Sequence, residues 1–186
     1  MRASDVNSFV AIDVETANSD CGSICQIGVV SVDKGEIVDE WQTLVDPGTP
    51  FSDRNIGIHG ITAWDVESAP TFSEIYDDVL SKLAGQVVAC HTMFDRRALR
   101  VACGIYNLQE VDCLWLDTAQ VVRRAWPQFR QRGYTLDNIA NYLGIKFSHH
   151  DALEDARAAA LVLLRAVEET GLTVRQWQDG QTPDQK

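Results

Sequence analysis

The sequence predicts an α/β fold in which a mixed β-sheet is flanked by α-helices. The chain opens with three apolar runs rich in β-forming residues, at 8–14, 23–32 and 36–45. Helical and strand patterns then alternate over the rest of the chain, which is typical of parallel strands joined by helices. A length of 186 residues with 45% hydrophobic residues is typical of one soluble globular domain.

The first strand is predicted to lie in the middle of the sheet. Residues 8–14 (SFVAIDV) are apolar on both faces of the strand, as expected where both faces are covered. The runs 23–32 and 36–45 are separated only by Asp33-Lys34-Gly35, and this short turn predicts a hairpin. The second and third strands are therefore expected to pair directly.

Helical spacing begins after a stretch rich in residues that break regular structure. The breakers, which predict a loop, are Pro47, Pro50, Gly57 and Gly60. Thr71 and Glu74 then form a capping-box pattern that predicts the start of a helix. The further predicted elements are a helix over 71–85, a strand over 86–90, a helix from Phe94 to Cys103 that Gly104 ends, a strand near 111–116, a helix near 117–125, a loop over 127–134, a helix over 136–143 that Gly144 closes, and a helix from Ala152 to before Gly171.

The charge balance argues against a protein that coats nucleic acid with a basic surface. The chain has 16 Lys+Arg against 27 Asp+Glu, a net charge of -11, and a sequence pI of about 4.6. Local arginines or bound cations would have to contact a nucleic-acid partner. We expect one domain over residues 1–178 and a polar tail over 179–186 that is disordered or links to a further domain.

The sequence favours a cytoplasmic protein without membrane contact. No apolar run approaches the ~18 residues of a membrane span, and the N-terminus lacks the apolar stretch of a signal peptide. The five cysteines are odd in number and scattered, which suits a reducing compartment and predicts buried or neutral thiols. Cys21 and Cys25 have no further ligands nearby that would complete a zinc site.

Two carboxylates end the predicted central strand. Side chains alternate along a strand, so Asp13 and Glu15 share the face of Phe9 and Ala11. Like charges at a buried strand end repel each other and resist desolvation, and a divalent cation compensates them best. Hard oxygen ligands suit magnesium or manganese. The alternative is that both carboxylates lie at an exposed strand end and are solvated.

A third carboxylate occupies a comparable place later in the chain. Asp95 follows the predicted strand 86–90, near the start of the next helix. By itself, a carboxylate there has an ordinary explanation as a partner of the helix dipole. The functional interpretation therefore depends on its combination with the other acids.

The start of the last long helix supplies a fourth carboxylate and a histidine. Asp151 and Glu154 predict the N-cap and its reciprocal acid, which leaves His150 on the loop just before the helix. Asp155 lies beside the apolar stripe of that helix, between small alanine neighbours. Small neighbours let the helix approach the sheet, so Asp155 could reach the carboxylates of the first strand. The alternative is an ordinary solvated helix start.

Three motifs in this order resemble those of the DEDD exonucleases of the histidine type. That family includes the epsilon proofreading subunit of bacterial replicative polymerase, ribonuclease T and oligoribonuclease. The motifs are Ile12-Asp13-Val14-Glu15-Thr16, the segment from Val88 to Asp95, and His150-x-x-x-x-Asp155-Ala156; supporting matches are Gln26-Ile27-Gly28, His59-Gly60-Ile61-Thr62 and Tyr134-Thr135-Leu136. The resemblance covers residues 8–168. One departure is Cys90-His91, where the family often has His-Asn.

The resemblance implies a ribonuclease H-like fold and a phosphodiester hydrolase that releases nucleoside 5′-monophosphates from the 3′ end of a single-stranded nucleic acid. It implies catalytic roles for the four acids and one histidine, with two divalent cations, Mg²⁺ or Mn²⁺, held by the acids. These residues are Asp13, Glu15, Asp95, Asp155 and the general base His150. A histidine with an unperturbed pKa of ~6.5 is suited to accept a proton from water around neutrality.

The resemblance also points to Thr16, His91 and Phe94 as substrate-binding residues. Phe94 is equally well explained as a core residue, and His91 as a hydrogen-bonded histidine at a strand end. Two arginine clusters could follow a single strand or could be solvated surface. They are Arg96, Arg97 and Arg100, and the cluster of Arg123, Arg124, Arg130 and Arg132 with Trp126, Phe129 and Tyr134.

DNA is favoured over RNA as the substrate, in replication or repair, with a polymerase or repair protein as a partner. One alternative is an exoribonuclease of the same chemistry, because sugar discrimination depends on one or two contacts to the 2′-hydroxyl. The other is a catalytically silent nuclease-fold module that binds nucleic acid or a polymerase. The presence of all four acids and the histidine ranks the enzyme first.

Overall fold

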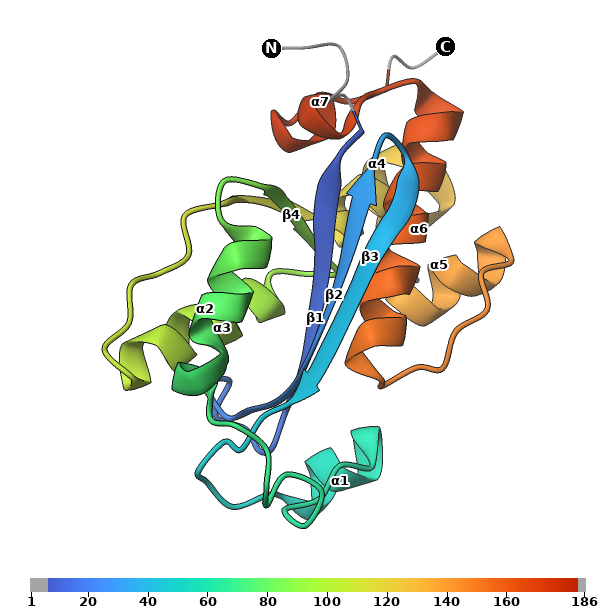
Figure 1. Ribbon diagram of the computed structural model, residues 1–186. Helices are drawn as coiled ribbons and strands as arrows, with labels where there is room; N and C mark the ends of the chain where they lie inside the picture. Colours follow the sequence, from blue (N-terminus) through green and yellow to red (C-terminus); the bar gives the residue numbers. More distant parts are fainter. Residues whose placement is uncertain (1–6, 184–186) are drawn as a thin grey trace.

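A five-stranded mixed sheet lies between two layers of helices in the computed structural model, which describes residues 7–183 (Figure 1). The strands are β1 (Phe9–Thr16), β2 (Ile24–Asp33), β3 (Glu36–Leu44), β4 (Val87–Cys90) and β5 (Leu114–Asp117). The helices are α1 (Asp53–His59), α2 (Phe72–Leu83), α3 (Phe94–Ile105), α4 (Thr118–Ala125), α5 (Leu136–Leu143), α6 (Ala152–Thr170) and α7 (Val174–Gln178), with the short 3-10 helix η2 (Pro127–Phe129). The predicted α/β class is confirmed.

The strand order β3-β2-β1-β4-β5 makes β1 the central strand, as predicted. β1 pairs antiparallel with β2 and parallel with β4. β2 and β3 form the predicted antiparallel hairpin, whose turn residues Lys34 and Gly35 both have positive φ, as a tight two-residue turn requires. Because β1 and β4 are parallel, the residues that follow them meet at the same edge of the sheet.

Both faces of β1 are covered, which explains why its sequence is apolar throughout. Phe9 and Ala11 pack into the core under α4, α5, α6 and α7. Val10 and Ile12 pack on the opposite face, under α2 and α3 (Figure 1). No helix within residues 7–183 is long and apolar enough to cross a membrane.

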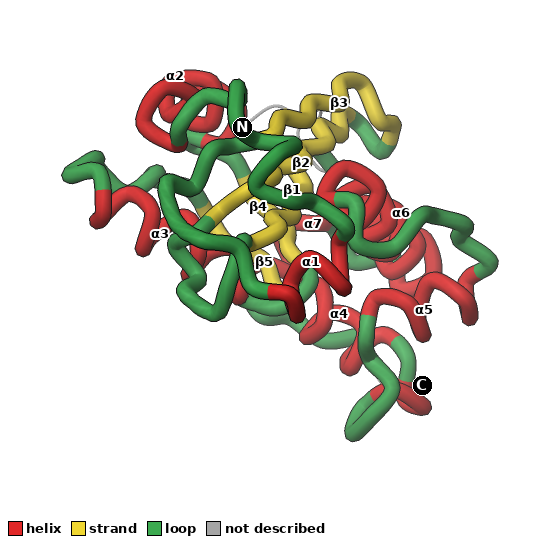
Figure 2. The backbone as a smooth tube through the Cα atoms, turned by 90° about the horizontal axis from the view of Figure 1, so that it is seen from below, coloured by secondary structure: helices red, strands yellow, loops and turns green. Residues whose placement is uncertain are grey.

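Helix α1 occupies the stretch that was expected to be a loop. The Ser52 side chain caps it by accepting a hydrogen bond from the Asn55 amide, and Gly60 ends it in the left-handed conformation. None of its residues is buried, so its sequence carries no apolar period that would have predicted a helix. Seen from below, α1 and neighbouring loops lie across the ends of the strands (Figure 2).

Two helices after α2 also differ from the prediction. Helix α3 continues through Gly104 to Ile105, so this glycine does not end the helix. Helix α7 was not predicted, although Thr173 and Gln176 form its capping box, and it buries Trp177 in the core. Of the predicted polar tail, residues 184–186 lie outside the described residues.

The five cysteines are all free thiols, as expected. Burial raises the pKa of Cys25 to about 12 and that of Cys113 to about 11. Both thiols are therefore neutral near pH 7, which agrees with the prediction of buried or neutral cysteines.

Candidate active site

A pocket of about 410 Å³ opens at the carboxyl ends of β1 and β4. All eight of the predicted site residues line it, although they come from distant parts of the sequence. They are Asp13, Glu15, Thr16, His91, Phe94, Asp95, His150 and Asp155. This position, outside the ends of parallel strands, is where α/β proteins commonly bind ligands.

Three carboxylates form the centre of the pocket. One oxygen from each of Asp13, Glu15 and Asp155 lies within 4.8 Å of the others. Burial, together with the neighbouring carboxylates, raises the pKa of Asp13 well above its usual value and that of Glu15 to about 7. Among residues 7–183, no hydrogen-bond donor or basic side chain contacts the carboxylate of Asp13 or that of Glu15, whereas Asp95 and Asp155 do accept hydrogen bonds. The repulsion between the two carboxylates is therefore not offset by a protein group.

Asp95 lies in the same pocket but outside this close group of three. Its side chain is 2% exposed, and its Oδ1 accepts a hydrogen bond of 3.0 Å from the Val14 amide of β1. Burial raises its pKa to about 7, against the opposing effect of the backbone hydrogen bonds that it accepts. The bond to β1 fixes the orientation of this carboxylate relative to the end of the central strand.

The approach of α6 to the sheet depends on Gly28 of β2, which pairs with Asp13 in the strand register. A Cβ atom on Gly28 would lie 2.3 Å from the backbone of Ala152 and Leu153. The neighbouring Gln26 accepts a hydrogen bond of 3.0 Å from the Ala152 amide through its Oε1. β2 therefore holds the first turn of α6 at the distance that brings Asp155 to β1.

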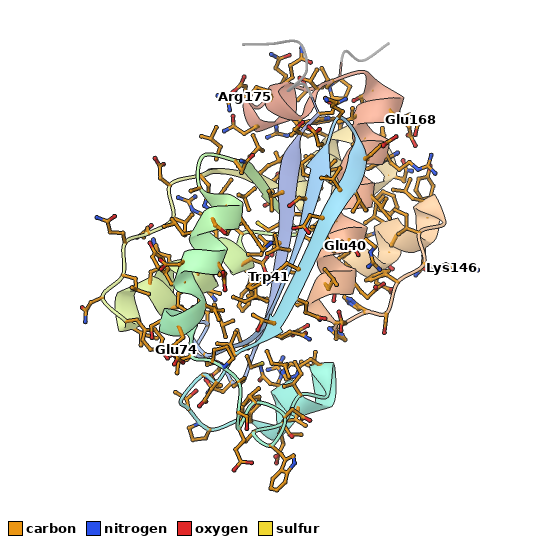
Figure 3. The ribbon with its side chains drawn as sticks, viewed as in Figure 1. Glu40, Trp41, Glu74, Lys146, Glu168 and Arg175 are labelled. Carbon is orange, nitrogen blue, oxygen red and sulfur yellow. The ribbon has the colours of Figure 1, made fainter. Side chains whose placement is uncertain are left out.

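Asp151 caps α6 as predicted, by accepting hydrogen bonds from the Leu153 and Glu154 amides. The prediction that Glu154 returns a bond to the cap residue is wrong. The Glu154 side chain instead pairs with Arg157, which also binds Glu40 on β3 at 2.7 Å. Glu40 lies on the strand beside α6 (Figure 3), so Glu154 takes part in charge pairing between helix and sheet in place of a return bond to Asp151.

Two consecutive histidines hold Asp155 from the loop before α6. His149 Nδ1 lies 2.6 Å from Asp155 Oδ1, and the His150 amide donates to Asp155 Oδ2 at 2.7 Å. The two imidazole rings stack with centroids 3.9 Å apart. Desolvation and the neighbouring His149 lower the pKa of His150. His150 is therefore neutral near pH 7 and has a lone pair that can accept a proton.

The contact of His149 with Asp155 was missed in the sequence. The motif spacing assigned a role only to the second histidine, His150. The signal that could have pointed to His149 is that it directly precedes His150 in the sequence. A positive φ of 68° at His150 turns the backbone between them, so that one histidine contacts Asp155 through its ring and the other through its amide.

Helix α1 supplies lining residues that the sequence did not single out individually. Asn55 donates to the Thr16 carbonyl at 2.8 Å, and His59 Nε2 contacts the same oxygen at 3.1 Å. His59 Nδ1 accepts from the Ile61 amide, so Nε2 carries the proton and donates. The side chain of Ile58, which is 44% exposed, forms part of the pocket wall.

His91 and Phe94 lie in different surroundings. His91 Nε2 donates to the Tyr134 carbonyl at 2.8 Å, while Nδ1 contacts the Thr118 hydroxyl at 3.0 Å. Burial lowers the pKa of His91, so the ring is neutral and its Nδ1 accepts a hydrogen bond from the Thr118 hydroxyl. The interpretation of Phe94 as a core residue is wrong, because its side chain is 38% exposed at the pocket.

The donor set at the centre of the pocket suits a divalent cation. Carboxylate oxygens are the ligands that Mg²⁺ and Mn²⁺ prefer. Asp13, Glu15 and Asp155 lie close together, and burial followed by the neighbouring carboxylates raises the pKa values of the first two. A cation would relieve the repulsion that these residues otherwise exert on one another.

Comparison with known proteins identifies relatives over most of the chain. A family model described as Exonuclease (RNase_T) matches residues 10–163. The PolC-type DNA polymerases III of Thermotoga petrophila and Thermotoga maritima are 34% and 33% identical to this chain over 165 residues. These alignments cover 87% of this chain and 12% of each relative, so the chain spans about one eighth of their length.

Two solved structures are also similar. Exonuclease X in complex with 5′ overhanging duplex DNA is 27% identical, with a TM-score of 0.77 over 91% of this chain and 97% of that one. The nuclease domain of 3′hExo bound to rAMP is 22% identical, with a TM-score of 0.70 over 89% of this chain and 93% of that one. At 22% identity, the similarity to the nuclease domain of 3′hExo is evidence for a shared fold alone.

Proposed function

This chain belongs to the DEDD exonuclease family, as its three motifs predicted, and we propose that it releases nucleoside 5′-monophosphates from the 3′ end of single-stranded DNA. The ribonuclease H-like fold is likewise confirmed. The observation that carries the proposal is that Asp13, Glu15, Asp95, His150 and Asp155 line one pocket. The DNA preference is supported by the relatives, which are named as DNA polymerases, and by the similarity to an exonuclease in complex with DNA.

In this proposal the four acids hold two divalent cations. Asp13, Glu15 and Asp155 supply the closely spaced oxygens, and Asp95 offers the oxygen that Val14 does not occupy. When bound, such cations lower the pKa of water and neutralise the charge that develops on the phosphate. The acids keep the cations at the end of β1, and the hydrogen bonds that Asp155 and Asp95 accept fix the orientation of their carboxylates.

His150 acts as the general base. It accepts a proton from the attacking water, whose oxygen forms a bond to phosphorus while the bond from phosphorus to the 3′-oxygen breaks. The leaving 3′-oxygen takes a proton from solvent, so the shortened strand ends in a 3′-hydroxyl, and the last nucleotide leaves with a 5′-phosphate. The lowered pKa of His150 supports this role, because the ring is neutral and able to accept the proton near pH 7.

The terminal nucleotide binds between the ends of β1 and α3. Thr16 and Phe94 lie at these ends, and both line the pocket. Asn55 and His59 orient the Thr16 backbone through its carbonyl group. Their contribution is to keep the strand end fixed while the substrate enters.

A polymerase context is the further part of the proposal. The PolC-type relatives are much longer than this chain, which covers 12% of them. We propose that the chain removes nucleotides in DNA replication or repair, where a polymerase or repair protein supplies the 3′ end.

Hydrolysis of 5′-labelled single-stranded DNA and RNA of the same sequence tests the proposal. We expect a ladder that shortens from the 3′ end of DNA with Mg²⁺ or Mn²⁺, and no product with EDTA. The His150→Ala variant should lose the ladder under the same conditions. Faster degradation of RNA would overturn the DNA preference, and intact strands of both kinds would favour a silent binding module.

A further inference from the structure

In one segment of this acidic chain, all the charged residues are arginines. Residues 118–136 contain four arginines and no aspartate or glutamate, although the whole chain has a net charge of -11. We call the part of this segment from Arg123 to Tyr134 the arginine loop. It includes the last turn of α4, the 3-10 helix η2 and the residues that lead to α5. Such a local reversal of charge needs a physical explanation.

The arginine loop has internal contacts that hold its shape. Arg123 is half-buried, its Nε donates to the Arg130 carbonyl at 2.9 Å, and its guanidinium lies 4.9 Å from the centre of the Tyr134 ring. Phe129 packs edge-on against Tyr142 of α5, with ring centroids 5.3 Å apart. The exposed arginines of the loop therefore extend from a folded support.

The four arginines of the loop have no carboxylate partners among the described residues. None of the four forms an ion pair with an acid among residues 7–183, whereas Arg157, Arg165 and Arg175 all do. Arg124, Arg130 and Arg132 are exposed to solvent. Unpaired guanidinium groups on a fixed support are suited to bind phosphate, because their planar array of donors matches its oxygens.

The arginine loop leads directly into the catalytic pocket. Tyr134, its last residue, lines the pocket together with Thr135 and Leu136. The Tyr134 carbonyl also accepts the hydrogen bond from His91, which lies in the second motif. A strand whose 3′ end occupies the pocket can therefore continue along this loop.

We propose that the arginine loop binds the phosphates of the single strand behind its 3′ end, with Arg130 and Arg132 as the contacting residues. The inference rests on the proposed function, because it uses the same substrate. Arg123 supports the loop through the Arg130 carbonyl and the Tyr134 ring. The loop compensates for the acidic surface elsewhere, so the protein gains affinity for a strand without a basic surface overall.

The test compares a long substrate with one that has no upstream strand. The double variant Arg130→Gln/Arg132→Gln is assayed on oligonucleotides of about 20 nucleotides, a length that exceeds the usual span of a single-strand site. Separate arms use DNA and RNA. The small substrate is the p-nitrophenyl ester of thymidine 5′-monophosphate, which enters the pocket but offers no further phosphates.

For the oligonucleotide we expect KM to rise about tenfold with kcat unchanged, because two phosphate contacts are lost. The slope of log affinity against log salt should become shallower by about 1.4 for a single strand. Hydrolysis of the small ester should stay within about twofold of wild type, since the pocket is untouched. An equal loss on both substrates, or an unchanged KM for DNA and RNA, would overturn the inference.

The matched control is Arg165→Gln/Arg175→Gln, which also removes two positive charges. Both residues are exposed and paired with acids. Figure 3 labels Arg175 and Glu168 at the end of the molecule opposite α1, and Glu168 is the acid that pairs with Arg165. This control should retain wild-type KM on the oligonucleotide. A tenfold rise in the control as well would mean that net charge, and not the arginine loop, sets the affinity.

Fluorescence anisotropy of a labelled oligonucleotide in EDTA separates this inference from the proposed function. Wild-type protein that binds the strand, with binding weakened about tenfold in the loop variant, supports the loop even if no hydrolysis occurs. Hydrolysis with equal binding by both proteins would leave the proposed function standing and overturn the loop.

Discussion

At the scale of single residues, Asp155 connects the two parts of the site. It lies within 4.8 Å of the Asp13 and Glu15 oxygens, and it is also held by His149 and by the His150 amide. The position of the predicted base therefore depends on the same carboxylate that belongs to the predicted cation site. Substitutions of His149 and His150 should therefore have different effects on Asp155, because His149 contacts it through the ring and His150 through the backbone amide.

The His150→Ala variant should lower kcat by about 10²–10⁴-fold, the usual effect of losing a general base. Its backbone amide still donates to Asp155, so binding of Mn²⁺ should change little. Single-turnover hydrolysis and Mn²⁺ titration measure the two effects separately. The control is His149→Ala, for which we expect a loss below about tenfold, since the ring only orients a carboxylate that the His150 amide also holds. A larger loss for His149→Ala than for His150→Ala would assign the base to His149.

The Asp13→Asn variant should abolish metal-dependent hydrolysis and raise the melting temperature of the metal-free protein near pH 8. The amide is neutral, so it relieves the repulsion among the buried carboxylates. Relief of about 1 kcal/mol corresponds to a rise of about 2–4 °C for a chain of this size. Thermal unfolding in EDTA gives the value. A melting temperature equal to or below that of wild type would contradict a strained acid cluster.

At the scale of elements, the site depends on how closely α6 packs against β2. The Gly28→Ala variant should destabilise the protein by about 1–3 kcal/mol, because the added methyl group meets the backbone of α6. Activity should fall as well, since the same turn of α6 carries Asp155. Urea unfolding and hydrolysis of labelled DNA measure both effects.

Gly57→Ala is the control for that substitution. A Cβ atom on Gly57 meets no other atom within 4 Å, and the residue lies inside helix α1. Stability should stay unchanged or rise by up to about 1 kcal/mol, because alanine favours helix more than glycine does. Equal destabilisation by the two substitutions would show that the close approach at Gly28 is not what matters.

The sequence predicted the strands and long helices well because their apolar periods were strong. The central place of β1 followed from its two apolar faces, and the cap at Asp151 placed the start of α6 correctly. Helix α1 could not be predicted in this way, because it buries none of its residues. Helix α7 carried a signal in Thr173 and Gln176, but its five residues are too few for an apolar period.

The site residues themselves were named from motifs, whereas their contacts required the fold. Spacing indicated that Asp155 could approach β1, but the reason is the absence of a side chain on Gly28, more than a hundred residues earlier. The bond between His91 and the Tyr134 carbonyl also joins segments that are far apart in the sequence. Such contacts depend on tertiary packing, which no local pattern records.

At the scale of the whole molecule, the carboxylates make stability depend on pH. Burial raises the pKa of Asp13, and raises those of Glu15 and Asp95 to about 7, above the ordinary values of the unfolded chain. A raised pKa in the folded state means that the folded protein binds protons more tightly. The contribution of these carboxylates to stability is then fully present below about pH 4, the unfolded pKa, and is lost as the pH rises through their folded pKa values, which are about 7 for Glu15 and Asp95.

The melting temperature of the protein in EDTA should therefore fall between about pH 5 and about pH 8. Added Mg²⁺ or Mn²⁺ should raise it more at the higher pH, because the ions bind the ionised carboxylates of the folded state. Differential scanning fluorimetry across this range provides the measurement. Glu15→Gln serves as the control, since it removes one titrating group and should flatten the profile. A cation effect of the same size at both pH values would count against binding at these carboxylates.

The position of α6 after all the other site elements in the chain has a consequence for biosynthesis. A ribosome-bound chain that has released β1 to α5 carries three of the four acids but lacks Asp155. Only when α6 leaves the ribosome and docks on Gly28 does the carboxylate group become complete. The carboxylate group is therefore incomplete as long as only β1 to α5 have left the ribosome.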